Sequence, residues 1–317
     1  MYFMVFQGES TMNETFAEHV STYFRHFRNE LEITNKSTYT IISYNTTITS
    51  FIEFVKQYKT PLSFESFKKI DLMNFLEYKN EMLQKQSELK ASSKRLYVTH
   101  LKTFFTFIQD NMDIEVKISK IFKVLIKTPK RTPKGIDDAN CQKFLNYLNA
   151  IPFNSFTNIR NSLIMKILFY TGARRGELSN MKVNEETFID KGQYYIIRTI
   201  GKGDKERILY IKKALIAEEL DAYKSNGFTN LSATKNGRIM SGSEIYSMIN
   251  ASYRRAGINK EYSGAHILRH TFAKHEYAKD KDIVKLQKRL GHANVNTTMI
   301  YADPTQKEVE RAFAEGL

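Results

Sequence analysis

The chain is poor in the features that form disulfides, membrane spans and leader peptides. Cys141 is the only cysteine among 317 residues. No intrachain disulfide can therefore form, and a reducing, cytoplasmic setting is expected. The apolar run 162–170 is too short to span a bilayer and is interrupted by Lys166. The first eleven residues lack the basic segment that opens a signal peptide, and we leave them out of the fold prediction.

Two chemical signatures are also missing. The sequence has no phosphate-binding loop of the GxxxxGK[ST] type, so the use of ATP is not expected. Its seven histidines are not grouped with cysteines or carboxylates at the spacing of metal ligands. We therefore expect neither a nucleotide nor a metal as a cofactor.

Acidic residues are scarce relative to basic ones. The chain has 34 of the former and 48 of the latter, which gives a net charge of +14 and a pI of about 9.5. This excess indicates an anionic partner, most often nucleic acid, although any protein from a lysine-rich proteome would carry a similar charge. The hydrophobic content of 42% allows packed cores, and the length suits two domains.

Apolar residues recur at helical spacing through the N-terminal third. This spacing predicts helices over 16–27, 41–55 and 92–111. A further helix is expected over 71–84, with Asp71 as its N-cap. The apolar side of helix 92–111 is aromatic, and we interpret it as core rather than as a surface on which bases stack; this set comprises Leu96, Leu101, Phe104, Phe105 and Ile108.

Basic residues gather on helix 92–111 and again between 117 and 134, where no acidic residue occurs. The basic side of the helix is either an ordinary solvated face or a DNA contact. The second stretch predicts a short amphipathic helix over 117–127, followed by a proline-containing linker over 128–135. A plain linker needs no such charge, so we expect phosphate contacts there. The DNA-binding candidates are Lys94, Arg95, Lys127, Lys130, Arg131 and Lys134.

A second domain is expected over 136–317, after a first domain over 14–127. Its helices are predicted at 137–148, 156–170, 243–256, 265–278 and 282–290. Two segments rich in β-branched and aromatic residues, 194–200 and 207–211, flank the sequence GKGDKE and predict a β-hairpin. The domain should therefore be mainly helical with one small sheet.

Five short motifs in this domain carry candidate chemistry. They are TGARRGEL with Arg174, GKG with Lys202, HILRH with His266 and Arg269, LGH with His292, and a tyrosine nine positions later, Tyr301. Arginine presents a planar fork of donors that matches phosphate oxygens. Tyrosine can act as a covalent nucleophile, and histidine can move a proton near neutral pH. These residue types suit the chemistry of a phosphodiester.

In this order and at these separations, the motifs resemble those of tyrosine recombinases, the phage integrase family, and within it the Xer type. The resemblance covers roughly residues 14–317, and KRTPKGID also looks like the interdomain linker of that family. It implies a helical, SAM-like core-binding domain of four to five helices. It also implies an α+β catalytic domain with a small antiparallel sheet, the two forming a clamp on DNA.

The resemblance assigns roles to individual residues. Tyr301 would attack the scissile phosphate, leaving a 3′-phosphotyrosyl link and a free 5′ hydroxyl. Spacing alone leaves Arg174 and Arg175 open as phosphate ligands; the family pattern selects Arg174, which Glu177 could hold in position. Arg269 would clamp the same phosphate, because His266 and Arg269, three residues apart, share a helix face.

The proton-transfer roles follow from the same resemblance. Lys202 would protonate the leaving oxygen, with Lys205 and Arg207 as nearby competitors, although GKGDKE by itself favours an ordinary solvated turn. His266 would accept the tyrosine proton or donate to an oxygen, and His292 would donate to the phosphate. We interpret His270 as structural and His275 as a surface residue.

The family also implies partners. The first is double-stranded DNA with an inverted-repeat recombination site. The second is further copies of the chain, which would form a homotetramer on two synapsed sites. A DNA translocase is a third partner that the resemblance allows. Two rounds of strand exchange would pass through a four-way junction, in Xer-like or mobile-element recombination. The segment 304–317 would be an exchange tail that docks into a neighbouring subunit, or else onto its own domain.

Two other functions remain open at this point. A type IB topoisomerase shares the phosphate chemistry but relaxes DNA alone. A DNA-binding regulator that never cuts would retain only the basic surface, and its signature would be a lost arginine or tyrosine. None of these residues is lost here.

Overall fold

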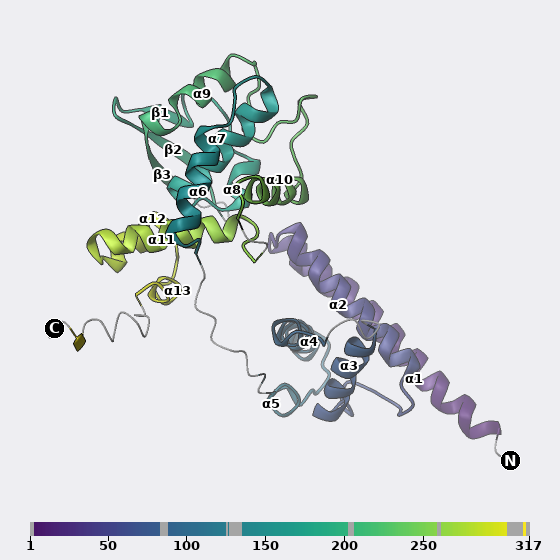
Figure 1. The fold of residues 1–317 in the computed structure, drawn as a ribbon. Coiled ribbons are helices and arrows are strands. Elements are labelled where there is room, and N and C mark those ends of the chain that lie inside the picture. Colours follow the sequence, from purple (N-terminus) through teal and green to yellow (C-terminus); the bar gives the residue numbers. More distant parts are fainter. Residues whose placement is uncertain are drawn as a thin grey trace. The chain divides into compact units, whose positions relative to one another are not determined.

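The structure is a computed structural model that describes residues 3–82, 88–124, 126, 135–201, 206–258, 261–302 and 313–314, with side chains described from residue 13 onward. The chain divides into two compact units, Met1–Lys130 and Arg131–Leu317. Helices dominate both, and a small antiparallel sheet lies in the second (Figure 1). The predicted fold class is confirmed. The domain limits 14–127, 128–135 and 136–317 stay a prediction.

The first unit is built from five helices within the described residues. They are α1 (Phe3–Ile33), α2 (Thr38–Gln57), α3 (Lys69–Glu81), α4 (Ala91–Asn111) and the single turn α5 (Ile118–Ile121). Its core is aromatic: Phe51, for example, lies edge-on to Phe67, Phe75 and Phe105 at centroid distances of 5.4–5.9 Å. The apolar side of α4 is therefore core, as predicted, except for Leu96, which is 45% exposed.

Three helix limits in this unit differ from the prediction. Asp71 is not the N-cap of α3 but lies three residues inside it, where its carboxylate accepts a hydrogen bond from the Lys68 backbone N–H at 2.8 Å. Of the amphipathic helix predicted over 117–127, the described residues form only the turn α5. The first eleven residues, left out of the prediction, belong to α1 from Phe3 onward. Among the described residues, no helix is long and apolar enough to cross a membrane.

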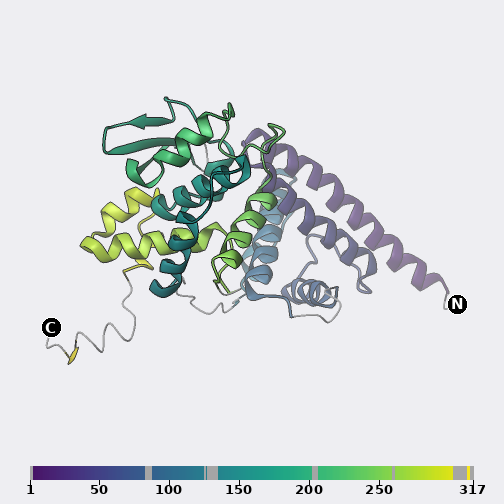
Figure 2. The same ribbon diagram turned by 45° about the horizontal axis from the view of Figure 1, so that its top comes forward.

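The second unit surrounds a buried helix. Helix α7 (Phe156–Thr171) contacts α6 (Asp138–Asn149), α9 (Ala217–Lys224), α11 (Ala265–Asp280) and strand β3 (Glu206–Lys212) (Figure 2). Its apolar residues occur all round its surface and are buried, as expected of a central helix. The remaining helices are α8 (Arg175–Ser179), α10 (Gly242–Arg255), α12 (Ile283–Leu290) and α13 (Asn296–Met299).

The sheet has the order β1 (Phe188–Asp190), β2 (Tyr194–Ile200) and β3 (Glu206–Lys212), all antiparallel. The predicted hairpin is β2–β3, and it is followed by the short 3₁₀ turn η1 (Lys213–Leu215). Burial alternates along both long strands, so Arg207, Leu209 and Ile211 face the interior. The strand period therefore turns one cation, Arg207, inward, opposite Thr199 of β2.

Candidate active site

The start of helix α8 positions Arg174. The preceding helix α7 ends at Gly172, whose φ of +61° is left-handed, and a Cβ there would lie 2.5 Å from the Phe272 ring. Glu177, three residues after Arg174, accepts a hydrogen bond from the Arg174 backbone N–H at 2.8 Å, which caps α8. The same carboxylate also accepts from Arg174 Nη1 at 2.9 Å. The sharp turn and the cap thus fix the direction of the Arg174 side chain.

Glu177 also binds the inward-facing cation of β3. Arg207 Nη1 donates to Glu177 Oε2 at 2.6 Å, and both side chains are almost wholly buried. Burial lowers the pKa of the Arg207 guanidinium, and the charge of Glu177 opposes that shift. Arg207 is thus bound to a carboxylate inside the unit rather than placed at the solvated tip of the hairpin.

Arg269 on α11 is 5% exposed. Its Nη1 donates to the carbonyl of Gly172 at 2.7 Å and its Nη2 to the carbonyl of Leu290 at 2.6 Å. Burial and the neighbouring Arg207 and Arg174 lower the pKa of Arg269 to about 9, which leaves it cationic at neutral pH. A guanidinium has five N–H donors, so donors remain for a further ligand.

The end of α12 gathers these arginines, which we call the arginine cluster: Arg174, Arg207 and Arg269. Three consecutive carbonyls each accept from one of them: Arg289 from Arg207 at 2.6 Å, Leu290 from Arg269 at 2.6 Å, and Gly291 from Arg174 at 3.1 Å. A helix C-terminus carries partial negative charge and unpaired carbonyls, so cations are favoured there. Residues from three distant segments therefore meet at one point.

The arginine cluster carries more charge than its carboxylate partner neutralises. Three guanidinium groups meet one carboxylate, that of Glu177. Buried charges are costly unless they are paired. Because Arg174 remains about a third exposed, this positive site is open on one side to an anionic ligand.

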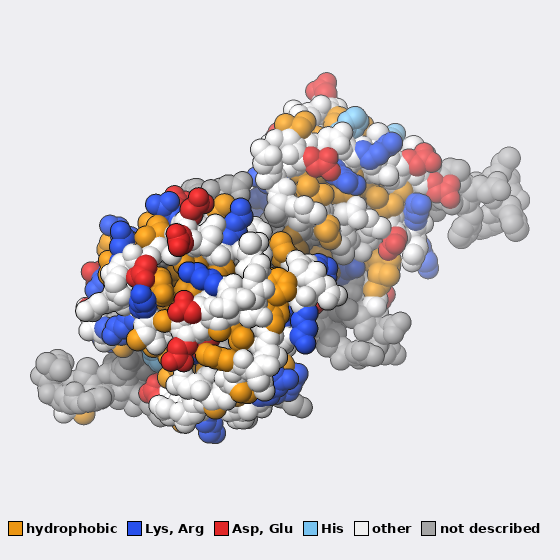
Figure 3. Space-filling model, turned by 90° about the horizontal axis from the view of Figure 1, so that it is seen from above, with side chains coloured by type: hydrophobic (Ala, Val, Ile, Leu, Met, Phe, Trp, Pro, Cys, Tyr) orange, Lys and Arg blue, Asp and Glu red, His pale blue; other side chains and the backbone are white. Residues whose placement is uncertain are grey.

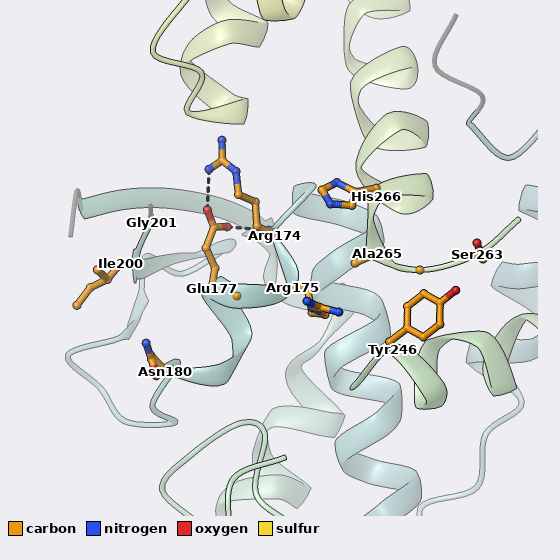
Figure 4. A pocket seen from close by; sticks show the side chains of 12 residues that line it. Arg174, Arg175, Glu177, Asn180, Ile200, Gly201, Tyr246, Ser263, Ala265 and His266 are labelled. Carbon is orange, nitrogen blue, oxygen red and sulfur yellow. Dashed lines mark hydrogen bonds and ion pairs between the residues drawn. The ribbon is translucent and has the colours of Figure 1, made fainter. Parts of the chain in front are cut away.

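His266 lies on that open side. It is exposed at the start of α11 and lines a pocket of about 530 Å³ together with Arg174, Arg175, Tyr246 and Ser263. Figure 4 shows His266 across this pocket from Arg174, whose guanidinium is bound to the Glu177 carboxylate. Burial of the ring and the charges of Arg269, Arg175 and Arg174 lower the pKa of His266. Arg175 Nη1 donates a hydrogen bond to the carbonyl of Gly242 at 3.2 Å.

His292 follows Gly291, the left-handed residue that ends α12 as predicted. Its Nδ1 is 2.8 Å from Thr298 Oγ1, which orients the ring. Burial and the three cations of the arginine cluster lower the pKa of His292 to about 4, so the ring is neutral near pH 7. A neutral imidazole still has one N–H to donate.

Tyr301 lies just beyond α13 and packs against the small apolar cluster formed by Phe272, Ala273, Leu286 and Leu290. Its hydroxyl is 2.5 Å from Nδ1 of His270. Burial raises the pKa of the Tyr301 phenol to about 12, partly offset by the charge of Arg269. His270, which the sequence leads us to interpret as structural, is therefore in direct contact with the tyrosine hydroxyl.

Several other predicted residues fall outside the described residues, as does most of the tail 304–317. They are Lys202, Lys205, Lys127, Lys130, Arg131 and Lys134. On α4 of the first unit, Lys94 is half-buried and Arg95 is exposed. Arg95 Nη2 donates to the carbonyl of Ile126 at 3.1 Å.

Charge on the outer surface is mixed. On the face shown in Figure 3, Lys and Arg side chains are interspersed with Asp and Glu. The excess of positive charge therefore does not form one continuous patch on that face. Within the described residues of the second unit, the arginine cluster brings three cations together at the end of α12.

Comparison with known proteins identifies the family of the chain. The model of the phage integrase family matches residues 134–308, and the chain belongs to that family. The tyrosine recombinase XerH of Campylobacter jejuni is 35% identical over 224 residues, which span 67% of this chain and 62% of that protein. This chain thus matches just under two thirds of that relative's length. XerD of Oceanobacillus iheyensis is 27% identical over 86% of this chain and 90% of its own.

Solved structures give the same result. A XerH site-specific recombinase bound to a palindromic difH substrate, in a post-cleavage complex, aligns with a TM-score of 0.71 at 26% identity. The alignment covers 88% of this chain and 80% of that one. A lambda integrase dimer on its core site shares the fold, with a TM-score of 0.63 at 17% identity. The resemblance to tyrosine recombinases of the Xer type is confirmed.

Proposed function

We propose that this protein is a site-specific DNA recombinase that cleaves and rejoins DNA through a phosphotyrosine. The observation that carries the proposal is the arginine cluster at the end of α12, a buried group of fixed cations with an open side. Tyr301 follows in the same stretch of chain and contacts α11. Fixed cations of this kind stabilise the charge that develops on a phosphate under attack.

The proposed steps assign one role to each of these residues. Tyr301 attacks the scissile phosphorus, a Tyr301–phosphate bond forms, and the bond to the 5′ oxygen breaks. Arg174 and Arg269 hold the non-bridging oxygens, and His266 and His292 donate to the same phosphate. Lys202 is the proposed proton donor to the leaving 5′ oxygen, since an alkoxide leaves poorly without a proton. The energy of the broken bond is kept in the phosphotyrosine, so a DNA hydroxyl can reverse the step.

The partners in this proposal are DNA and other copies of the chain. The XerH recombinase of the solved complex is bound to a palindromic difH substrate, which favours an inverted-repeat site for this protein as well. We propose a homotetramer on two synapsed sites, strand exchange through a four-way junction, and assembly through the tail 304–317. The two units would close around the duplex as a clamp. The names of the relatives favour a recombinase over a topoisomerase or a non-cutting regulator.

A covalent-trapping experiment tests the proposal. A binding site is first selected from a library of inverted repeats, and a nick near the scissile position then lets the cleaved strand diffuse away. A denaturing gel should show a protein–DNA adduct with the wild type and none with Tyr301→Phe, while both bind the duplex. Binding without any adduct in the wild type would favour the non-cutting regulator.

Relaxation of a supercoiled plasmid separates the remaining alternative. A recombinase that needs two sites should leave a plasmid without the selected site supercoiled. Efficient relaxation of that plasmid would instead assign the protein to the topoisomerases.

A further inference from the structure

We propose that His270 is a catalytic residue that takes the phenolic proton from Tyr301 as the tyrosine attacks DNA. This inference rests on the proposed function and adds the proton acceptor on the nucleophile side. His270 Nδ1 is 2.5 Å from the Tyr301 hydroxyl, and the two ring centroids are 5.7 Å apart. A general base must lie within hydrogen-bond reach of the proton that it removes, and His270 does.

The choice between the two histidines of HILRH follows from the helix. His266 and His270 are four residues apart on α11, one turn from each other. His266 is exposed and lines the pocket beside Arg174. Half-buried His270 contacts Tyr301 instead. These positions place His266 where it can act on the phosphate, and His270 where it can accept the proton of Tyr301.

The protonation state suits an acceptor. Burial, together with His266, Arg269 and Lys274, lowers the pKa of His270 to about 4, so the ring is neutral near pH 7. The Tyr301 hydroxyl then donates to Nδ1 while Nε2 carries the ring proton. Burial also raises the pKa of the phenol to about 12. Without DNA the proton therefore stays on Tyr301, and the nucleophile remains a neutral phenol that donates its hydrogen bond to His270.

DNA changes that balance. A phosphodiester seated on the arginine cluster brings a negative charge beside Arg269, one of the cations that hold down the pKa of His270. Protonation of His270 becomes easier as the Tyr301–phosphorus bond forms and the 5′ oxygen departs with a proton from its own donor. In the reverse reaction His270 returns its proton to the phenol, so the residue is regenerated in each cycle.

The conservative variant is His270→Asn. The asparagine amide oxygen occupies the place of Nδ1 and keeps an acceptor for the hydroxyl, but it cannot take up a proton. Single-turnover cleavage of the nicked duplex should slow by about 10² or more, the usual contribution of a general base, with unchanged DNA affinity. The matched control is His275→Asn, an exposed histidine on the same helix, which should cleave at the wild-type rate. If His270→Asn fails to bind DNA, His270→Gln replaces it.

A modified substrate separates the two ends of the reaction. A 5′-bridging phosphorothiolate needs no proton on its leaving sulfur, so it should rescue Lys202→Ala but leave His270→Asn slow. Wild-type cleavage by His270→Asn, or its rescue by the phosphorothiolate, would overturn the inference and leave the proposed function standing. Failure of the wild type and His275→Asn to form any adduct would overturn the proposed function itself.

Discussion

At the scale of single residues, Glu177 is the counter-charge on which two arginines depend. One carboxylate oxygen binds Arg174 Nη1 and the other binds Arg207 Nη1. The same group caps α8. A residue that the sequence suggested as a support for one arginine therefore also holds the buried cation of β3.

Replacing that carboxylate should destabilise the fold. Glu177→Gln leaves two guanidinium groups without their counter-charge, and removal of one partner of a buried ion pair costs about 3 kcal/mol or more. Urea denaturation should show that loss in the free energy of unfolding. Glu186→Gln, at an exposed position of the same unit, should change it by less than about 0.5 kcal/mol. Equal losses in the two variants would contradict the ion-pair account.

The histidines predict a pH dependence. In the folded state the pKa values of His270 and His292 are both lowered to about 4, whereas an unfolded histidine titrates near 6.5. The unfolded chain therefore binds protons first as the pH falls. Their contribution to stability is complete above about pH 6.5 and is lost as the pH falls toward 4.

This loss can be measured by urea denaturation at a series of pH values. Between pH 7 and 4.5 the free energy of unfolding should fall, by about 1 kcal/mol for each of the two half-exposed rings once solvent screening is allowed for. In the His292→Asn variant the free energy of unfolding should fall less steeply over this range. A wild-type slope in His292→Asn would show that this ring does not titrate as described.

At the scale of elements, the C-terminus of α12 is the centre of the site. Gly291 has a φ of +63°, and a Cβ there would lie 2.8 Å from Arg207 Cδ. The left-handed turn exposes the last carbonyls of the helix to the arginine cluster and directs the chain toward His292. The glycine of the LGH motif is thus explained by backbone geometry and by contact with an arginine.

A pair of alanine variants separates those two effects. Gly291→Ala and Gly192→Ala both place a side chain at a positive φ, which costs about 1 kcal/mol, but nothing lies within 4 Å of a Cβ at Gly192. Only Gly291→Ala should displace Arg207 and slow DNA cleavage, by about 10-fold or more if one transition-state donor is disturbed. Equal cleavage rates in the two variants would show that the arginine cluster tolerates the added methyl group.

At the scale of the whole molecule, charge should control DNA binding. Each phosphate that the protein neutralises adds about −0.9 to the slope of log affinity against log salt. Replacing Lys127, Lys130 and Arg131 together should therefore flatten the slope without changing the preferred site. Replacing Lys182, Lys191 and Lys224, which lie on the second unit, is the charge-matched control. An unchanged slope in the first variant would identify the linker as merely solvated.

The sequence by itself determined the fold class and most element positions. The helical spacing of apolar residues and the alternation in the hairpin are local patterns. Such patterns can be recognised without knowing which elements pack against them. Short elements were missed, among them α8, α9, α13 and β1, because a turn or two of helix or three strand residues carry too little periodicity. The order of motifs also identified the family, which the comparisons confirm.

Only the tertiary structure decided how the site residues divide their contacts. No local rule predicts that three consecutive carbonyls at the end of α12 each accept a hydrogen bond from an arginine of a different segment. Strand alternation could have turned Arg207 inward, but its partner Glu177 lies thirty residues away. His270 looked structural because helix spacing places it relative to His266, not relative to Tyr301, which packs back onto α11 from beyond α13. Hydrogen bonds between distant segments depend on how those segments pack together, and no single stretch of sequence determines that packing.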